Sequence, residues 1–274
     1  MSTGPTYLQF HAAFLVPAVL FMVATAFVSR RRLGSATVWP RGWTRRYWGG
    51  VAVITLVALA YTTPWDNYLI AHDVWWYGEG SVLGRVGHAP VEEYLFVAVQ
   101  PPLTALWLAH LSLPRTWATA DDPLRLRAVA TAVALGIGML GTTLLATAAT
   151  FYLGAILTWA APILALQWAV GAPQLWARRR VVAIGTLVPT AYLSFADRIA
   201  IEYGIWVLSE RYTTGVTLGG LPVEEATFFL VTNLFVVQGL VLYRWASDRW
   251  AAETRAVGRW SLGRRASEPT EDST

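Results

Sequence analysis

The chain has 274 residues, of which 55% are hydrophobic and 14% are charged, and its mean hydropathy is +0.43. This composition is typical of a membrane protein with several spans and excludes an ordinary soluble globule. Cysteine is absent and all 21 basic residues are arginine, which excludes disulfides, cysteine metal sites, a lysine Schiff base and a Walker-type phosphate loop. The formal net charge of +4 is attributed to arginines on the cytoplasmic side of a membrane, and not to nucleic-acid binding.

Seven apolar stretches are long enough to cross the ~30 Å hydrocarbon core of a bilayer. In chain order they are Tyr7–Val28, Tyr47–Thr63, Pro90–Leu111, Arg127–Thr147, Thr150–Val170, Val181–Phe195 and Pro222–Tyr243. The second and sixth are short, and we expect them to continue as helix into the residues that follow. The first begins without a basic leader, so it is interpreted as a retained span and not as a cleaved signal peptide. The sequence therefore predicts an all-α, multi-pass membrane bundle.

Arginine is distributed unevenly between the predicted loops. The arginine-rich loops follow the first, third, fifth and seventh spans, at residues 30–32 and 41–46, 115–127, 178–180 and 244–265. Because cytoplasmic loops carry the excess of basic residues, the N-terminus is predicted outside and the C-terminus inside. Residues 246–274 form a polar tail on the cytoplasmic side, which is expected to be disordered.

A Pro-Val-Glu-Glu motif occurs twice, at residues 90–93 and at residues 222–225, and each copy opens a long apolar stretch. A charged side chain at bilayer depth costs about 2.5–3.5 kcal/mol on insertion scales, so such residues suggest a function. Acidic residues also belong at helix N-termini, where the helix dipole favours them. A single copy would suit that structural interpretation equally well, whereas the duplication favours a functional one.

The repeat extends beyond the motif. Asp66 lies 24 residues before the first motif (90 − 66) and Asp197 lies 25 residues before the second (222 − 197), while Trp75 and Trp206 each follow nine residues after these aspartates. An offset of four crossings preserves orientation, which predicts parallel repeats related by a pseudo-two-fold axis along the membrane normal, with a site at their interface. The predicted units are a first repeat (1–112), a connector with the fourth span (113–149), a second repeat (150–245) and the tail (246–274).

Adjacent residues on a helix point ~100° apart, so the two glutamates of a pair cannot share one face. Glu93 aligns with the polar Gln100 and Thr104 and is expected to face the bundle interior, whereas Glu92 aligns with apolar residues such as Phe96. The helix N-terminus favours the ionised form of a carboxyl group, and burial beside a second carboxylate favours the protonated form. Where burial prevails, one glutamate of each pair can act as an acid. Which glutamate does so is left open.

Other candidates for chemistry carry weaker signals. Asp66 and Asp197 suit a proton relay, and equally suit ordinary turn residues at a membrane interface. The single acidic pair at residues 121–122 lacks the second cluster that a magnesium-dependent prenyltransferase needs. The histidines show no metal-ligand spacing; they are His11, His72, His88 and His110. The sequence contains no G-x-G-x-x-G dinucleotide fingerprint. Together with the histidine spacing, this predicts neither a metal nor a cofactor.

The duplicated motifs, the two aspartates and the tandem three-span halves resemble the integral-membrane lycopene cyclase family, in its fused form as found in haloarchaea and in the cyclase domain of fungal bifunctional enzymes. The resemblance covers nearly all of the chain apart from the tail. It implies a cell-membrane enzyme acting on lycopene, a lipid-soluble polyene, among membrane lipids and without nucleic acid. Acid protonation at C2, attack of the C5–C6 double bond on the cation at C1, and loss of the C6 proton then produce a β-ring without net oxidation.

The same resemblance implies roles for particular residues. The acid and base candidates are Glu92 or Glu93, Glu224 or Glu225, with Asp66 and Asp197 as proton partners. Aromatic faces stabilise cations, and the candidate walls of the substrate pocket are Trp75, Trp206, Tyr94, Phe96, Phe228 and Phe229. Whether the halves build one shared site or two is left open, as are ring type, mono- or bicyclic product and oligomeric state.

A membrane transporter or proton-coupled carrier is the alternative, because tandem repeats with intramembrane carboxylates also occur in carriers. Discontinuous helices with central breaks would favour the carrier, and few candidate breaks occur apart from Pro17, Pro162 and Pro189.

A seven-span photoreceptor is excluded because it requires a lysine to bind retinal, and the sequence contains no lysine.

Overall fold

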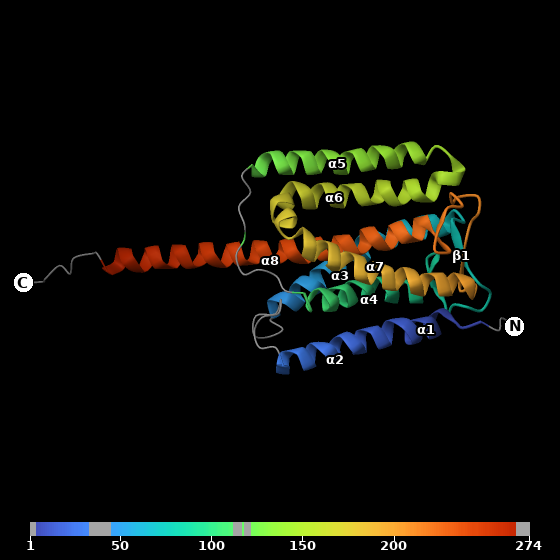
Figure 1. The fold of residues 1–274 in the computed structure, drawn as a ribbon, viewed down its shortest axis with the longest axis horizontal. Coiled ribbons are helices and arrows are strands. Elements are labelled where there is room, and N and C mark those ends of the chain that lie inside the picture. The colour runs from blue at the N-terminus through green and yellow to red at the C-terminus, as the bar shows by residue number, and fades with distance from the viewer. Residues whose placement is uncertain (1–3, 33–44, 112–116, 118–121, 267–274) are drawn as a thin grey trace, which may run out of the picture.

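The structure is a computed structural model that describes residues 4–32, 45–111, 117 and 122–266, without the side chains of residues 27, 29–32 and 255–266 (Figure 1). Most of the chain is helical. The helices are α1 (Tyr7–Phe10), the π-helical η1 (His11–Leu15), α2 (Val16–Arg32), α3 (Arg45–Ala71), α4 (Val91–Leu108), α5 (Pro123–Leu144), the 3₁₀ turn η3 (Ala148–Thr150), α6 (Phe151–Ala177), α7 (Arg179–Glu202) and α8 (Val223–Ala266). Figure 1 shows them side by side in one bundle, with the strands at one end and α5 packed on α6 at its edge.

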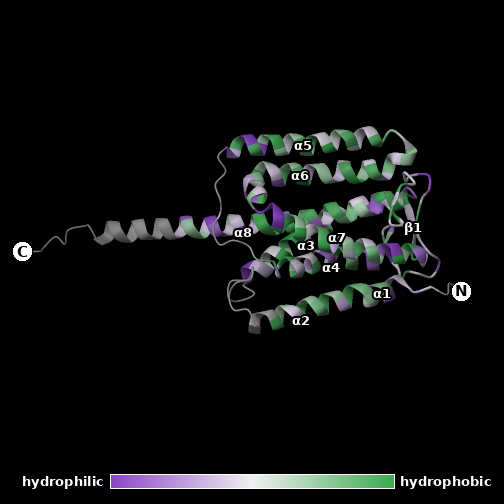
Figure 2. Cartoon of the chain, viewed as in Figure 1, coloured by the Kyte–Doolittle hydropathy of each residue, from purple (hydrophilic) through white to green (hydrophobic). Residues whose placement is uncertain are grey.

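Five helices in the described part of the chain are long and apolar enough to cross a membrane: Tyr7–Ala26, Arg45–Ala71, Pro123–Leu144, Ala148–Ala177 and Val223–Thr254. These agree with five of the seven predicted spans. The other two predicted stretches form the helices α4 and α7, which fall outside this group of five. Figure 2 shows hydrophobic residues along the middle of the bundle and hydrophilic ones at the end that carries the strands. Large apolar side chains such as Leu56 and Met139 are exposed on the outer faces, as expected of a surface in contact with lipid.

Two helices extend beyond the apolar stretches predicted for them, and these extensions contain Asp66 and Asp197. α3 continues to Ala71 and α7 to Glu202, which confirms the expectation that these short stretches extend. Asp66 and Asp197 therefore lie inside helices, five residues before each one ends (71 − 66 and 202 − 197). Both are buried, so neither is a turn residue at the surface.

The predicted tail also differs from the structure. α8 runs without interruption to Ala266, so most of the segment expected to be disordered is helical, and its last residues, 267–274, lie outside the described residues. The reason is local. Residues 246–266 are rich in alanine and arginine and contain no proline, so they propagate the membrane helix that precedes them.

Short strands connect the two halves at one end of the bundle. The strands are β1 (Trp75–Tyr77), β2 (Arg85–Val86), β3 (Ala89–Pro90), β4 (Trp206–Leu208), β5 (Thr217–Leu218) and β6 (Leu221–Pro222). β1 and β4 pair antiparallel with Trp76 opposite Val207, and the hairpins β2–β3 and β5–β6 lead into α4 and α8. In the second hairpin Gly219 and Gly220 both have positive φ (59° and 88°), as the tight turn between such short strands requires. Equivalent elements of the two halves thus meet at the β1–β4 pair.

Candidate active site

A small buried cavity lies beneath the β1–β4 pair and brings both halves together. Four carboxyl groups from four helices line it, namely Asp66 of α3, Glu93 of α4, Asp197 of α7 and Glu225 of α8. Asp66 and Asp197 are 3% and 2% exposed. The remaining wall is aromatic and aliphatic: Tyr7, Phe10, Trp65, Trp75, Tyr77, Phe96, Tyr152, Leu193, Ala196, Trp206, Phe228 and Phe229. No arginine or histidine is among these described lining residues, so the acids share the cavity without a basic partner.

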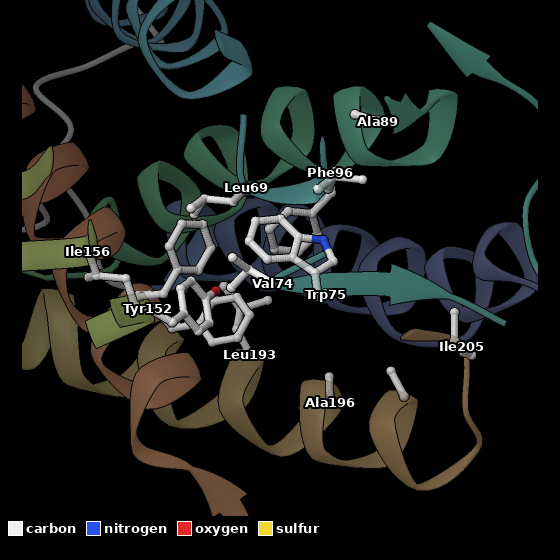
Figure 3. Packing of buried hydrophobic residues seen from close by; sticks show 14 of the residues in the cluster. Leu69, Val74, Trp75, Ala89, Phe96, Tyr152, Ile156, Leu193, Ala196 and Ile205 are labelled. Carbon is white, nitrogen blue, oxygen red and sulfur yellow. The ribbon is translucent and has the colours of Figure 1, made fainter. Parts of the chain in front are cut away.

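The aromatic side chains pack closely around the acids. The rings of Trp65 and Phe228 are stacked with their centroids 5.8 Å apart, and Trp75 lies 5.5 Å from Tyr152. Figure 3 shows Trp75 and Tyr152 gathered in one buried cluster with Leu193. Such a cluster supplies the π faces and the exclusion of water that a cationic intermediate requires.

Glu93 accepts two hydrogen bonds from phenols on the same oxygen. Tyr7 donates its hydroxyl to Oε2 over 2.9 Å and Tyr77 donates to the same Oε2 over 2.7 Å. The indole Nε1 of Trp75 in turn donates to the Tyr77 hydroxyl oxygen over 3.2 Å. Burial, and secondarily the neighbouring charge of Glu93, raises the pKa of Tyr77 in β1. The Tyr77 hydroxyl is therefore a neutral donor.

Glu225 has a single phenol partner. Tyr152 donates its hydroxyl to Oε1 over 2.9 Å. Tyr7 and Tyr152 occupy equivalent places, since each stands at the start of the first helix of its half and is followed by leucine. The position equivalent to Tyr77, at the 131-residue offset that relates Trp75 to Trp206 (206 − 75), is Leu208. The two halves thus bind their glutamates with different numbers of donors.

The first glutamate of each pair has another role. Glu92 and Glu224 are fully buried, at 0% exposure, and neither lines the cavity. Each accepts a backbone N–H from the loop that covers the end of its own helix: Glu92 from Leu83 over 2.8 Å and Glu224 from Thr214 over 2.7 Å. The structure thus divides each pair into a glutamate that holds a loop and a glutamate that faces the cavity.

The predicted faces agree with this division. Gln100 and Thr104, aligned with Glu93, are buried between helices and both donate to the Asn233 side chain of α8, over 2.8 and 2.6 Å. The polar stripe of α4 therefore faces the interior, as predicted.

Five of the six predicted wall residues line the cavity, and Tyr94 does not. The Tyr94 hydroxyl donates to the Val86 carbonyl over 2.6 Å and accepts from Asn67 over 3.1 Å. Tyr94 follows Glu93 by one position, so it points ~100° away from the cavity, toward the β2–β3 hairpin. The lining residues that were not predicted from the sequence are Tyr7, Phe10, Trp65, Tyr77, Tyr152, Leu193 and Ala196. The Tyr-Leu pair that starts each half was a signal that could have identified two of them.

An apolar groove adjoins the acid cavity. We name it the α3/α6/α8 groove; it has a volume of about 140 Å³ and shares Phe96 and Phe228 with the cavity. A second groove of about 340 Å³, the α2/α4/α7 groove, is lined by residues of those three helices. At the offsets that relate the two halves, seven lining residues correspond: Ala18 and Ile163, Met22 and Gln167, Leu103 and Phe235, Trp107 and Gly239, Val188 and Val57, Pro189 and Ala58, and Tyr192 and Tyr61.

One tyrosine that lines each groove also makes an equivalent hydrogen bond. The Tyr61 hydroxyl donates to the Trp159 carbonyl over 2.8 Å, and the Tyr192 hydroxyl donates to the Phe14 carbonyl over 2.7 Å. The α2/α4/α7 groove shares no described lining residue with the acid cavity, so a chain lying in the α3/α6/α8 groove is the better placed to reach the acids.

The fold and the cavity define a helical, membrane-type protein with a buried acidic and aromatic site shared by two homologous halves. The lycopene cyclase family model matches residues 13–111 and 147–243, one region in each half. The chain is 57% identical over 202 residues to a lycopene beta-cyclase of Halobacterium salinarum, covering 73% of this chain and 84% of that protein. It is 35% identical over 206 residues to a bifunctional lycopene cyclase/phytoene synthase of Aspergillus niger, covering 70% of this chain and 34% of that protein.

The chain therefore belongs to the lycopene cyclase family, as its resemblance predicted. The two matched regions contain both Pro-Val-Glu-Glu motifs and leave α5 outside them. No solved structure matches the chain.

Proposed function

We propose that this protein is a lycopene β-cyclase, which closes the linear ends of lycopene to β-rings by acid catalysis within the membrane. The observation that supports this most strongly is the shared cavity: four buried carboxyl groups with no basic partner among the described lining residues, enclosed by aromatic rings. Four ionised carboxylates in one dry cavity would repel one another strongly, so protons must be shared among them. A site that stores protons next to apolar walls suits the protonation of a hydrocarbon.

The proposed reaction conserves atoms and electrons. A carboxylic acid gives its proton to C2 of the terminal isoprenoid unit, which leaves a cation at C1. The C5–C6 double bond attacks C1, so that a C1–C6 bond forms and the positive charge moves to C5. Loss of the C6 proton to a carboxylate restores a double bond between C5 and C6. Trp65, Trp75 and Phe228 present aromatic faces to this path. A desolvated aromatic face stabilises a cation by about 2 kcal/mol.

Asp66 and Asp197 return the proton for the next turnover in this proposal. Both line the same cavity as Glu93 and Glu225. Asp197 also retains a buried Oδ2 without a hydrogen-bond partner in the described part of the chain. An oxygen in that state is able to accept a proton from one glutamate and pass it to the other.

The α3/α6/α8 groove is the proposed path of the polyene chain. It extends along α8 as far as Gly239, fourteen residues beyond Glu225 (239 − 225), or about 21 Å at 1.5 Å per residue. An extended polyene can therefore lie parallel to the helices while its end occupies the acid cavity. The cavity and the groove together are smaller than usual ligand pockets of ~300–1,000 Å³, so the rings of Phe96 and Phe228 between them must turn aside on binding.

The proposed setting is the cell membrane, with seven spans, the N-terminus outside and the C-terminus inside. α4 and α7 then cross beside the five apolar helices, with their polar residues turned inward, and the acid cavity lies toward the outer surface. The contacts of Gln100 and Thr104 with Asn233 support the inward placement, because intramembrane polar groups need partners. Surrounding lipids contact the exposed apolar faces.

Expression in lycopene-accumulating cells tests the proposal. Pigment chromatography is expected to show conversion of lycopene to monocyclic and bicyclic products, with the protein in the membrane fraction. Unchanged lycopene in cells whose membranes contain the protein would exclude the activity. The carrier alternative predicts that outcome, and membership of the lycopene cyclase family gives it no support.

A further inference from the structure

We infer that the two halves are chemically unequal: Glu225 is the acid that protonates the polyene, Glu93 is the base that removes the C6 proton, and Tyr77 sets the difference. This inference rests on the proposed cyclase function. It assigns separate roles to two residues that the sequence repeat presents as equivalents.

The first argument is the hydrogen bonding of Glu93. Its Oε2 accepts from both Tyr7 and Tyr77, which occupies the lone pairs of that oxygen with donors. The Tyr77 oxygen accepts from the indole of Trp75, and its own hydroxyl hydrogen is directed at Glu93. Two phenol donors on one oxygen suit a carboxylate, since hydrogen bonds to ionised acceptors are the stronger ones. Glu93 is thus arranged as the acceptor of a proton.

The second argument is that the half containing Glu225 has no residue equivalent to Tyr77. Glu225 has one phenol donor, Tyr152, on Oε1, and among the described residues no donor reaches its Oε2. Leu208 stands where a second phenol would be, and its side chain cannot donate. Glu225 therefore has one phenol donor fewer than Glu93 to stabilise its carboxylate form, and it lines the same cavity.

The third argument is the position of the unequal residues. Tyr77 pairs with Trp206 and Trp75 pairs with Leu208 in the β1–β4 ladder, so residues 77 and 208 sit at matching places above the cavity. Leu208 packs against the same buried cluster that contains Tyr77. A tyrosine at 208 would lie on the same face of β4 as Trp206, because alternate residues of a strand share a face. The difference between the halves is therefore a substitution at equivalent sites.

The roles give a balanced cycle. Glu225 donates its proton to C2 and becomes a carboxylate, the ring closes, and Glu93 takes the C6 proton and becomes the acid. Transfer of that proton from Glu93 to Glu225 through Asp66 or Asp197 restores the starting state. No oxidant or reductant takes part.

The test uses membranes that contain the full chain, supplied with unlabelled lycopene in D₂O. The wild-type protein is expected to release cyclic product with deuterium at C2. Glu225→Gln is expected to give neither product nor labelled lycopene, because the first proton is never delivered. Glu93→Gln is expected to lose the β-ring yet return lycopene with deuterium at C2, or rings with a displaced double bond, because protonation still occurs and the C6 proton has no base.

Variants at the unequal position provide the matched comparison. Tyr77→Phe removes one donor to a charged acceptor and is expected to slow β-ring formation about tenfold or more, while deuterium at C2 of recovered lycopene increases. Leu208→Tyr adds a donor beside Glu225 and is expected to slow labelling and ring formation together. Glu92→Gln, which changes a buried acid outside the cavity, serves as the control for folding and is measured with the membrane level of each variant.

The outcomes separate the inference from the proposed function. Deuterium exchange in Glu225→Gln, or the same loss of exchange in both glutamate variants, would overturn the assignment of acid and base while leaving the wild-type activity intact. A wild-type protein that forms no ring would instead remove the proposed function. Equal effects of Tyr77→Phe and Tyr152→Phe on exchange would show that Tyr77 does not distinguish the halves.

Discussion

The division of each Pro-Val-Glu-Glu motif into a loop-holding and a cavity-facing glutamate makes a quantitative prediction. Replacing both loop-holding acids, Glu92→Gln with Glu224→Gln, keeps an oxygen acceptor for the Leu83 and Thr214 amides. An ordinary hydrogen bond of this kind contributes ~0.5–1.5 kcal/mol to stability, so weakening it costs no more than that range. The expected cost is about 1 kcal/mol of stability at each site, with cyclisation reduced less than about threefold.

Replacing the cavity-facing acids has a different consequence. General acid–base groups contribute about 10²–10⁴-fold, and a hydrocarbon offers no polar group by which another donor could act on it. The double variant Glu93→Gln with Glu225→Gln is therefore expected to lose at least about 10³-fold in activity while still entering the membrane. Pigment chromatography measures product, and immunoblots of membrane fractions normalise it to protein. Loss of activity in the first double variant as severe as in the second, at equal protein level, would refute the division.

Three further predictions follow from the same structure. Gly239→Trp is expected to fill the α3/α6/α8 groove and abolish conversion of lycopene, because even a Cβ there meets Ile54 at 3.1 Å. Ala18→Trp in the α2/α4/α7 groove is the control and should leave most activity. Equal loss of product in the two variants, measured by chromatography, would contradict the proposed path. Asn233→Ala leaves buried donors on α4 without their acceptor and is expected to destabilise the protein by about 1–3 kcal/mol, which lowers its melting temperature in detergent. An unchanged melting temperature would show that these hydrogen bonds do not stabilise the protein. Co-expressed fragments 1–121 and 122–274 should restore cyclisation that neither fragment supports alone, because each supplies two of the four acids, and activity from one fragment would show that the site is not shared.

Much of this architecture could be predicted from the sequence because it depends on repeated local patterns. Apolar stretches of membrane length indicated the helices, and the duplicated acids indicated where the halves meet. The continuation of α3 and α7 was expected, and it carries Asp66 and Asp197 to the cavity from inside a helix. The helical period separated Glu93 from Glu92, although it could not say which one faces the substrate.

The remainder depends on contacts that no local pattern encodes. β1 and β4 are three residues long, and alternation over so few residues is not a detectable strand signal. Tyr7 reaches Glu93 across 86 positions of sequence, which only the packed bundle reveals. Trp65 lies within a stack of rings beside the acids, and neither copy of the repeated motif contains it. The tail was interpreted from its polarity, which says little about helicity when alanine and arginine dominate.

Gene duplication alone would build a site in which both acids are equivalent, and proton-initiated cyclisation needs them to differ. The differences between the halves are consistent in direction. The half that contains Glu225 carries Leu208 in place of a second phenol, and its helix α8 carries Gly239 where α4 carries Trp107. Gly239 lines the groove that adjoins the acid cavity, and in the proposed path the polyene lies there along α8, the helix that carries Glu225. The proposed path of the polyene and the proposed role of Glu225 as the acid therefore both point to the end of α8 that carries Glu225.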